Sequence, residues 1–197
     1  MSVIMDVQAR LILFFILNHL LVDCTSTLTY KLNDGNEIPA IALGTSLGHE
    51  PDVNPTITQN ELVDWCREHG VVVMGYSPFG GILGRKADAP APRANDTLLQ
   101  ELAETHNKTV PQILLRYLLD RNIVAMPRST KRKRINRNFD IEDFKLSPEE
   151  VEKLSGFNKN YRLRTPVKWY DHPHFPFEKK NLTQEEIKYI IDHSKED

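Results

Sequence analysis

The sequence feature that most constrains the fold is the apolar stretch "VVVMGYSPF" at residues 71–79. A strand that is apolar at consecutive positions, rather than at alternate ones, is typical of a parallel sheet with both faces covered. A second run of this kind, "NIVAMP", follows at residues 122–127. Parallel strands need a crossover connection, and the intervening chain is long enough to supply helices. The two runs therefore predict an α/β fold.

Helical patterns flank both runs. Before the first run, Leu62, Val63 and Cys66 recur at helical spacing. Thr58 and Glu61 are expected to form a capping box at the start of this helix. The order helix–strand–helix–helix–strand–helix implies parallel strands joined by right-handed crossovers. The expected helices are Gln59–His69, Asp96–His106, Pro111–Arg121, Lys133–Asn138, the stretch after Ser147 and Thr183–His193.

The N-terminal part of the expected domain begins with a hairpin. The run Asn33-Asp34-Gly35-Asn36 predicts a tight turn, because Asp-Gly supplies the positive φ that such turns need. An apolar strand, Ile41 to Leu43, is expected to follow it.

The first residues of the chain have the pattern of a secretory signal. Arg10 precedes an apolar run, Leu11–Val22, of 12 residues. This is shorter than the ~20 residues that span a bilayer, but it fits the hydrophobic part of a signal peptide. Three glycosylation sequons begin at Asn95, Asn107 and Asn181. We expect a signal peptide over residues 1–24 and a secreted chain; a buried N-terminal helix and a cytoplasmic chain are the alternative.

Metal and disulfide frameworks are not expected. The sequence has only Cys24 and Cys66, too few for a disulfide scaffold or a zinc site. His172 and His174 form an H-x-H pair, but they lack a third ligand and are expected on a surface loop.

A cluster of cations lies in "PRSTKRKRINRNF", residues 127–139. It could face nucleic acid, a membrane, the nuclear import machinery, a small phosphate or only solvent. The net charge of −2 argues against nucleic acid, because such binders usually show a basic surplus over the whole domain. Ser129, Thr130 and an expected helix N-terminus suit a phosphate group. The basic residues are Arg128, Lys131, Arg132, Lys133, Arg134 and Arg137.

Four blocks of the sequence carry a resemblance to a known family. They are "LNDGNEIPAIALGTSL", "NPTITQNELVDWCREHGVVVMGYSPFG", "TVPQILLRYLLDRNIVAMPRSTKRKRINRNFDIEDFKLSPEEVEKL" and "NKNYRL". These blocks resemble the aldo-keto reductases, a family of (β/α)8 TIM-barrel enzymes that reduce carbonyl compounds with NADPH. The resemblance implies a partial TIM barrel over residues 27–197, whose strands resemble the first, seventh and eighth of the family.

The resemblance also implies that NADPH is the anion that the basic cluster faces. Tyr76 would stack on the nicotinamide, and Ser77, Phe79 and Gly80 would line the pyrophosphate path. The family usually has Lys at the position of Arg128 and an acidic residue at that of Arg137. The adenosine end would be held by Arg128, Ser129, Thr130, Arg134 and Asn138.

The sequence departs from the family after Gly48, which is followed almost at once by the second block. The family places an Asp, a Tyr, a Lys and a His between these points, and together they donate a proton to the carbonyl substrate. Roughly 150 residues are missing relative to a typical barrel. We expect no catalytic residues and no useful carbonyl reduction by this chain alone. A non-enzymatic remnant that binds NADPH or a partner, and a short isoform of an active secreted reductase, are the alternatives.

Missing neighbours would leave two apolar sheet edges, at "IALG" and "VVVMGY". Such edges carry unpaired N–H and C=O groups that can pair with another chain. We therefore expect marginal stability, aggregation or self-association through the open edges.

Overall fold

The structure is a computed structural model that describes most of the central part of the chain. The expected signal peptide, the H-x-H pair, the sequon at Asn181 and most of the expected last helix lie outside the described residues. No helix in the described part is long and apolar enough to cross a membrane. The described residues are 28–41, 52–84 and 89–163, with Thr183, Glu185 and Lys188.

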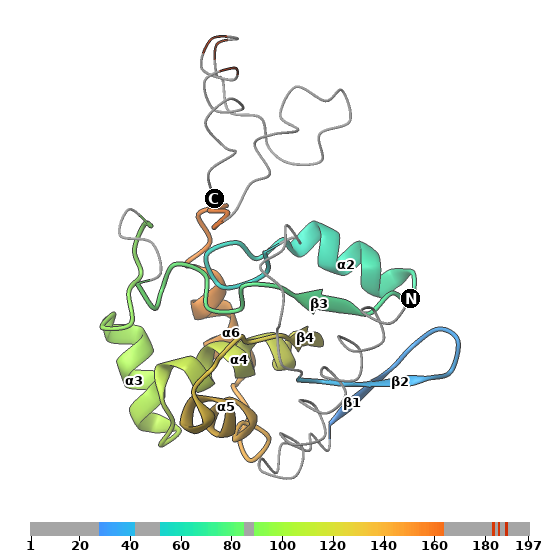
Figure 1. Cartoon of the computed structure of the whole chain (residues 1–197), viewed down its shortest axis with the longest axis horizontal. Helices are drawn as coiled ribbons and strands as arrows, with labels where there is room; N and C mark the ends of the chain where they lie inside the picture. The colour runs from blue at the N-terminus through green and yellow to red at the C-terminus, as the bar shows by residue number, and fades with distance from the viewer. Residues whose placement is uncertain are drawn as a thin grey trace, which may run out of the picture.

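The described chain alternates strands and helices, as the sequence predicted (Figure 1). A hairpin comes first, and α4 lies at the centre of the helices that follow. The elements are β1 (Thr29–Lys31), β2 (Glu37–Pro39), α2 (Asn60–Glu68), β3 (Val73–Gly75), α3 (Thr97–Thr105), α4 (Val110–Asp120), β4 (Ile123–Ala125), α5 (Arg132–Phe139) and α6 (Pro148–Ser155).

Strands β3 and β4 form a parallel pair, which confirms the parallel sheet that the apolar runs predicted. Both edges of this pair have a short neighbour. Ile41 forms a parallel bridge with Ala125 of β4, and Asp52 forms one with Tyr76 just after β3. β4 is thus an inner strand. Within residues 28–41, 52–84 and 89–163, the outer edge of β3 has a neighbour near its C-terminal end.

The predicted hairpin is confirmed. β1 and β2 pair antiparallel, and Gly35 in the turn has a φ of 90°. The Asp34 side chain accepts a hydrogen bond from the backbone N–H of Asn36 at 3.0 Å. The Tyr30 hydroxyl donates to the carbonyl oxygen of Leu119 at 3.0 Å, which ties the hairpin to α4.

Three helix starts follow the sequence closely. Asp96 caps α3 through its side chain, which accepts from the N–H of Leu98. Thr109 and Ser147 form capping boxes at the starts of α4 and α6. Helix α4 contacts α3, β4, α5 and α6. Nearly all its residues are buried, so it forms the centre of the core.

The expected start of α2 was wrong. Its N-cap is Gln59, with a φ of 47° and no side-chain cap, rather than Thr58. Thr58 is buried, and its carbonyl oxygen accepts a hydrogen bond from the distant Arg121 at 2.9 Å. Tertiary contacts therefore hold Thr58 outside the helix. The expected apolar face is also incomplete, because Val63 is buried but Leu62 is 46% exposed.

The expectation that both faces of "VVVMGYSPF" are covered was wrong as well. Met74 in the middle of β3 is 55% exposed and Val71 is 46% exposed. All three residues of β4 are buried. The two strands have similar sequences, so the difference comes from their neighbours and not from their own side chains.

Candidate cofactor-binding site

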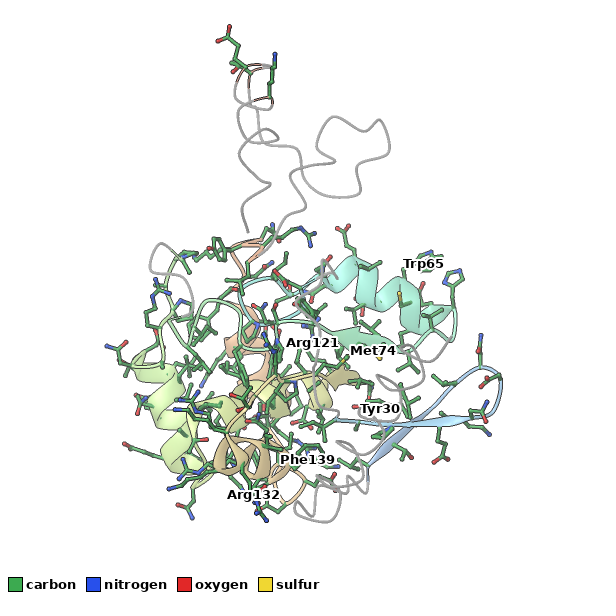
Figure 2. The ribbon with its side chains drawn as sticks, in the orientation of Figure 1. Tyr30, Trp65, Met74, Arg121, Arg132 and Phe139 are labelled. Atoms are coloured by element: carbon green, nitrogen blue, oxygen red, sulfur yellow. The ribbon has the colours of Figure 1, made fainter. Side chains whose placement is uncertain are left out.

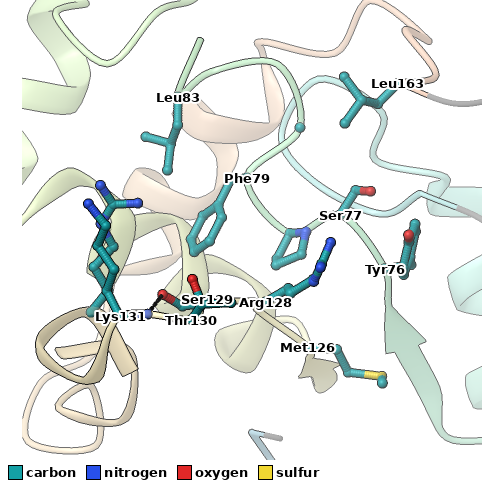
Figure 3. Close-up of a pocket in the computed structure, with 13 residues that line it drawn as sticks. Tyr76, Ser77, Phe79, Leu83, Met126, Arg128, Ser129, Thr130, Lys131 and Leu163 are labelled. Atoms are coloured by element: carbon teal, nitrogen blue, oxygen red, sulfur yellow. Dashed lines mark hydrogen bonds between the residues drawn. The ribbon is translucent and has the colours of Figure 1, made fainter. Parts of the chain in front are cut away.

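The site lies where β3 and β4 end. Because the strands are parallel, the segments that follow them leave from the same edge of the sheet, where ligands of α/β proteins bind. Between these segments is a pocket of about 370 Å³ (Figure 3). Its walls are Tyr76, Ser77, Pro78, Phe79, Gly80, Leu83, Met126, Arg128, Ser129, Thr130, Lys131, Arg134 and Leu163.

The turn after β3 is held in an uncommon conformation. Ser77 and Gly80 both have positive φ, at 47° and 51°. The Asn54 side chain donates a hydrogen bond to the Ser77 carbonyl oxygen at 3.1 Å, and it accepts from the Thr56 hydroxyl at 2.7 Å. A Cβ added to Gly80 would lie 2.6 Å from the Asn54 Oδ1 atom. Only glycine fits here, and Asn54 fixes the wall of the pocket.

Ser77 supplies a polar atom that the described residues leave unsatisfied. The residue is 8% exposed, and its Oγ is buried without a hydrogen-bond partner in the part of the chain that the structure describes. Burying a hydroxyl without a hydrogen-bond partner costs free energy, so such groups are rare in folded proteins and are often found at functional sites. Its place in the pocket wall makes a polar ligand atom a suitable partner.

The wall that follows β4 is basic. Ser129 Oγ accepts a hydrogen bond from the backbone N–H of Lys131 at 3.2 Å, just before α5 begins. Arg128, Lys131 and Arg134 line the pocket, and no acidic residue lies in the first turn of α5. Cations at a helix N-terminus are unfavourable, because the helix dipole is positive there. An anion in the pocket would compensate both the dipole and the side-chain charges.

The structure brings together all the predicted cofactor-binding residues except Asn138. Asn138 belongs to α5 but is only 6% exposed and does not line this pocket. Its predicted contact with an adenine stays untested. The role of the others in binding a cofactor also stays a prediction.

Sequence reasoning missed part of the wall. Lys131 lies in the basic run and could have been included on that signal alone. Leu163 comes from a distant segment, where its N–H donates to the Asp52 carboxylate at 2.7 Å. No local pattern would have placed it at the pocket. The other missed residues are Pro78, Leu83 and Met126.

Within residues 28–41, 52–84 and 89–163, no group of three or more His, Cys, Asp or Glu side chains could hold a metal ion. The chemistry that these residues offer is anion binding by cations, hydroxyls and a helix N-terminus.

The family model of the aldo/keto reductase family matches residues 47–159. The chain belongs to the aldo/keto reductase family. Aldo-keto reductase AKR2E4 of Bombyx mori is 47% identical over 126 residues, which are 64% of this chain and 41% of that protein. Aldo-keto reductase family 1 member D1 of Mus musculus is 37% identical over 132 residues, or 66% of this chain and 40% of that protein.

Solved aldo-keto reductase structures match the fold. The crystal structure of Bombyx mori AKR2E4 in complex with NADP has a TM-score of 0.62 at 46% identity, over 64% of this chain and 41% of that one. AKR2E5 complexed with NADPH, from the same silkworm, has a TM-score of 0.64 at 33% identity. The match covers 67% of this chain and 41% of that one. This member of the family therefore has part of an α/β TIM-barrel fold, and its described residues form no closed barrel. It spans about 40% of the length of these relatives.

Proposed function

We propose that this chain binds NADP(H) in the pocket between the ends of β3 and β4, and that it does not reduce carbonyl compounds by itself. The observation that carries the proposal is the meeting of two distant segments in one pocket. Tyr76–Gly80 forms one wall, and the basic segment Arg128–Arg134 forms the other.

The proposal assigns the strands to positions in the family barrel. The strand at Ile41 corresponds to the first barrel strand, β3 to the seventh and β4 to the eighth. The bridges support this order, because the eighth strand of a closed barrel lies between the seventh and the first. Here β4 pairs with β3 on one side and bridges Ile41 on the other.

The residues of the pocket fit the dinucleotide phosphates. Arg128 and Arg134 supply guanidinium groups, and Lys131 adds a compact ammonium charge. The Ser77 hydroxyl, which has no hydrogen-bond partner among the described residues, would gain an acceptor. Gly80 lets the turn pack closely against Asn54, which fixes this wall of the pocket. Bound NADPH would supply a hydride, and this chain would supply only its binding and orientation.

Carbonyl reduction also needs an acid beside the nicotinamide. The family resemblance leaves no candidate for it in this sequence. Tyr30 donates its hydroxyl to the Leu119 carbonyl oxygen, and burial raises the pKa of this tyrosine. The Tyr117 hydroxyl is engaged with Ser155 and Arg121. Small carbonyl compounds are thus proposed as substrates of the full-length relatives only.

Fluorescence titration with NADPH and NADH tests the binding. We expect Arg134→Ala to weaken NADPH binding by roughly tenfold through loss of a charge-assisted contact, and NADH binding much less. Arg137→Ala is the matched control, because Arg137 is an exposed arginine of the same helix outside the pocket. No saturable NADPH binding, or equal losses in both variants, would contradict the proposal.

NADPH oxidation with an aromatic aldehyde tests the second half of the proposal. We expect no turnover above the rate without protein. Turnover at the rate of full-length aldo-keto reductases would show that another residue supplies the proton. It would leave the binding proposal intact.

A further inference from the structure

The turn between α3 and α4 contains one of the glycosylation sequons, Asn107-Lys108-Thr109. Asn107 is exposed, and its φ of 51° lies in the left-handed region. Its backbone N–H donates to the Glu104 carbonyl oxygen at 3.0 Å, and the N–H of Lys108 donates to the Ala103 carbonyl oxygen at 2.8 Å. These two hydrogen bonds form a Schellman motif, which favours glycine or asparagine at the position of Asn107. The end of α3 therefore depends on the backbone of Asn107.

The side chain of Asn107 is open to modification, whereas those of the two residues that follow it are engaged. The Asn107 side-chain amide makes no hydrogen bond in the part of the chain that the structure describes. The Lys108 ammonium lies 2.8 Å from Asp143 Oδ2. The Thr109 hydroxyl donates to Gln112 Oε1 at 2.8 Å, at the capping box of α4. An oligosaccharide on the Asn107 amide would therefore displace no side-chain contact of the described fold.

A groove of about 540 Å³ lies beside Asn107. Its polar walls include Gln100 and Glu104 from α3, Gln112 from α4 and Asp140 after α5. Amide and carboxylate groups of this kind can hydrogen-bond the hydroxyl groups of a sugar. Side chains on the outer face of α3 project away from the rest of the molecule (Figure 2), so a sugar chain has room beside this helix. Among the described residues, the groove shares none with the cofactor pocket.

We infer that the chain carries an N-linked glycan on Asn107, with its first sugar at this groove. The inference depends on the secretory signal expected over residues 1–24, because sequons are modified in secreted proteins. It does not depend on cofactor binding. The donor is an oligosaccharide linked to a lipid diphosphate. A bond forms between Asn107 Nδ2 and the first sugar carbon, the bond from this carbon to the diphosphate oxygen breaks, and the amide proton leaves with the lipid diphosphate.

Three variants separate the sequon from the structural roles of its residues. Thr109→Asp removes the acceptor sequence and keeps a good N-cap for α4, whereas Thr109→Ser, its matched control, keeps both. Asn107→Gly removes the acceptor amide and keeps a residue that favours the left-handed end of α3. A thermal melt of each variant shows that it is folded.

Site mapping of the full chain tests the inference. The chain is expressed with its own N-terminus in eukaryotic cells, recovered from cells and medium, and treated with peptide N-glycosidase, which converts a glycosylated Asn to Asp. We expect mass spectrometry to find this conversion at Asn107 in the wild type and in Thr109→Ser. We expect a complete loss of the glycan at this position in Thr109→Asp and Asn107→Gly. The position of the converted residue distinguishes Asn107 from the sequon at Asn95.

An unmodified Asn107 in the wild-type chain overturns the inference, whether or not the chain is secreted. A glycan at Asn95 alone overturns it too. So does a glycan that reaches Asn107 only when a foreign secretory leader replaces residues 1–24, because the chain would then not enter the pathway by itself. Retention of the Asn107 glycan in Thr109→Asp would show that the sequon does not direct the modification, and this outcome also contradicts the inference.

Discussion

β3 and β4 are neighbouring strands with similar sequences and different surroundings. β4 pairs with β3, bridges Ile41 and packs on α4, and its three residues are buried. In the part of the chain that the structure describes, β3 has one full neighbour, and Met74 at its centre is 55% exposed. An apolar run thus predicts that a strand forms. How deeply the strand is buried depends on other segments of the chain.

The difference in burial between β3 and β4 extends to the two walls of the pocket that follow these strands. The Tyr76–Gly80 wall follows the less buried strand and depends on Asn54 for its shape. The Arg128–Arg134 wall follows the buried strand. We expect the first wall to be the more sensitive to changes around β3, and the second to be preserved as long as the core is intact.

Amide exchange should give the largest contrast between the strands. The Ala125 N–H donates to the Ala40 carbonyl oxygen at 3.0 Å inside the core, so Ala125 does not bond to Met74 across the β3–β4 pair. In a parallel register of this kind Val124 makes the bonds to β3, and the N–H of Met74 points away from β4. In dilute samples we expect Ala125 to exchange on the order of a thousandfold more slowly than Met74. Exchange measured by NMR at each amide checks this. Equal rates would show that β3 and β4 are protected alike.

Truncation of paired side chains should give the next largest contrast. Ile123 of β4 is fully buried and faces the half-buried Val73 of β3 in the register. We expect Ile123→Ala to lower the free energy of unfolding by about 2–4 kcal/mol, and Val73→Ala by about 1 kcal/mol. Urea unfolding measures both. Met74→Ala, at an exposed position, should stay within about 0.5 kcal/mol of the wild type.

A methyl group at Gly80 tests the wall that follows β3. We expect Gly80→Ala to cost about 2 kcal/mol in stability and to weaken NADPH binding, because the positive φ and the contact with Asn54 both exclude a Cβ. Gly84→Ala is the matched control, since Gly84 also has a positive φ, of 76°, but no atom within 4 Å of the added Cβ. A cost no larger than that of the control would show that Asn54 yields.

The smallest effect is expected at an ion pair beside α4, the helix that covers β4. Lys108 Nζ lies 2.8 Å from Asp143 Oδ2, and this hydrogen bond holds the pKa of Asp143 below its usual range. The stabilisation is therefore present above the usual carboxylate pKa of about 3.9 and is lost as pH falls through the lowered value. Lys108→Met should cost about 0.5–1 kcal/mol at pH ~7 and nearly nothing at pH ~2. Urea unfolding at both pH values is the measurement.

Local sequence patterns predicted the elements that are determined by residues close together in the sequence. Asp96, Thr109 and Ser147 cap helices because each side chain is within reach of the backbone N–H groups that follow it. The turn at Gly35 forms because glycine tolerates its φ of 90°. The basic wall of the pocket was also visible, because its residues are close together in the sequence.

The features that the sequence did not predict depend on how other segments of the chain pack around them. Thr58 has the residue type of a cap, but Arg121 binds its carbonyl oxygen. Leu163 lines the pocket because Asp52 binds its backbone. Met74 is exposed because of what its neighbouring segments leave uncovered. The contacts of Thr58 and Leu163 join segments more than 60 residues apart, which no local pattern records.

The placement of the pocket across the ends of both strands has a thermodynamic consequence. A ligand that touches both walls holds the exposed strand against the buried one, so its occupancy and the folding equilibrium are linked. At a ligand concentration of ~100 times Kd, this linkage is worth about 2.7 kcal/mol. A bound dinucleotide would then stabilise the β3–β4 pair in the way that an additional neighbouring strand would.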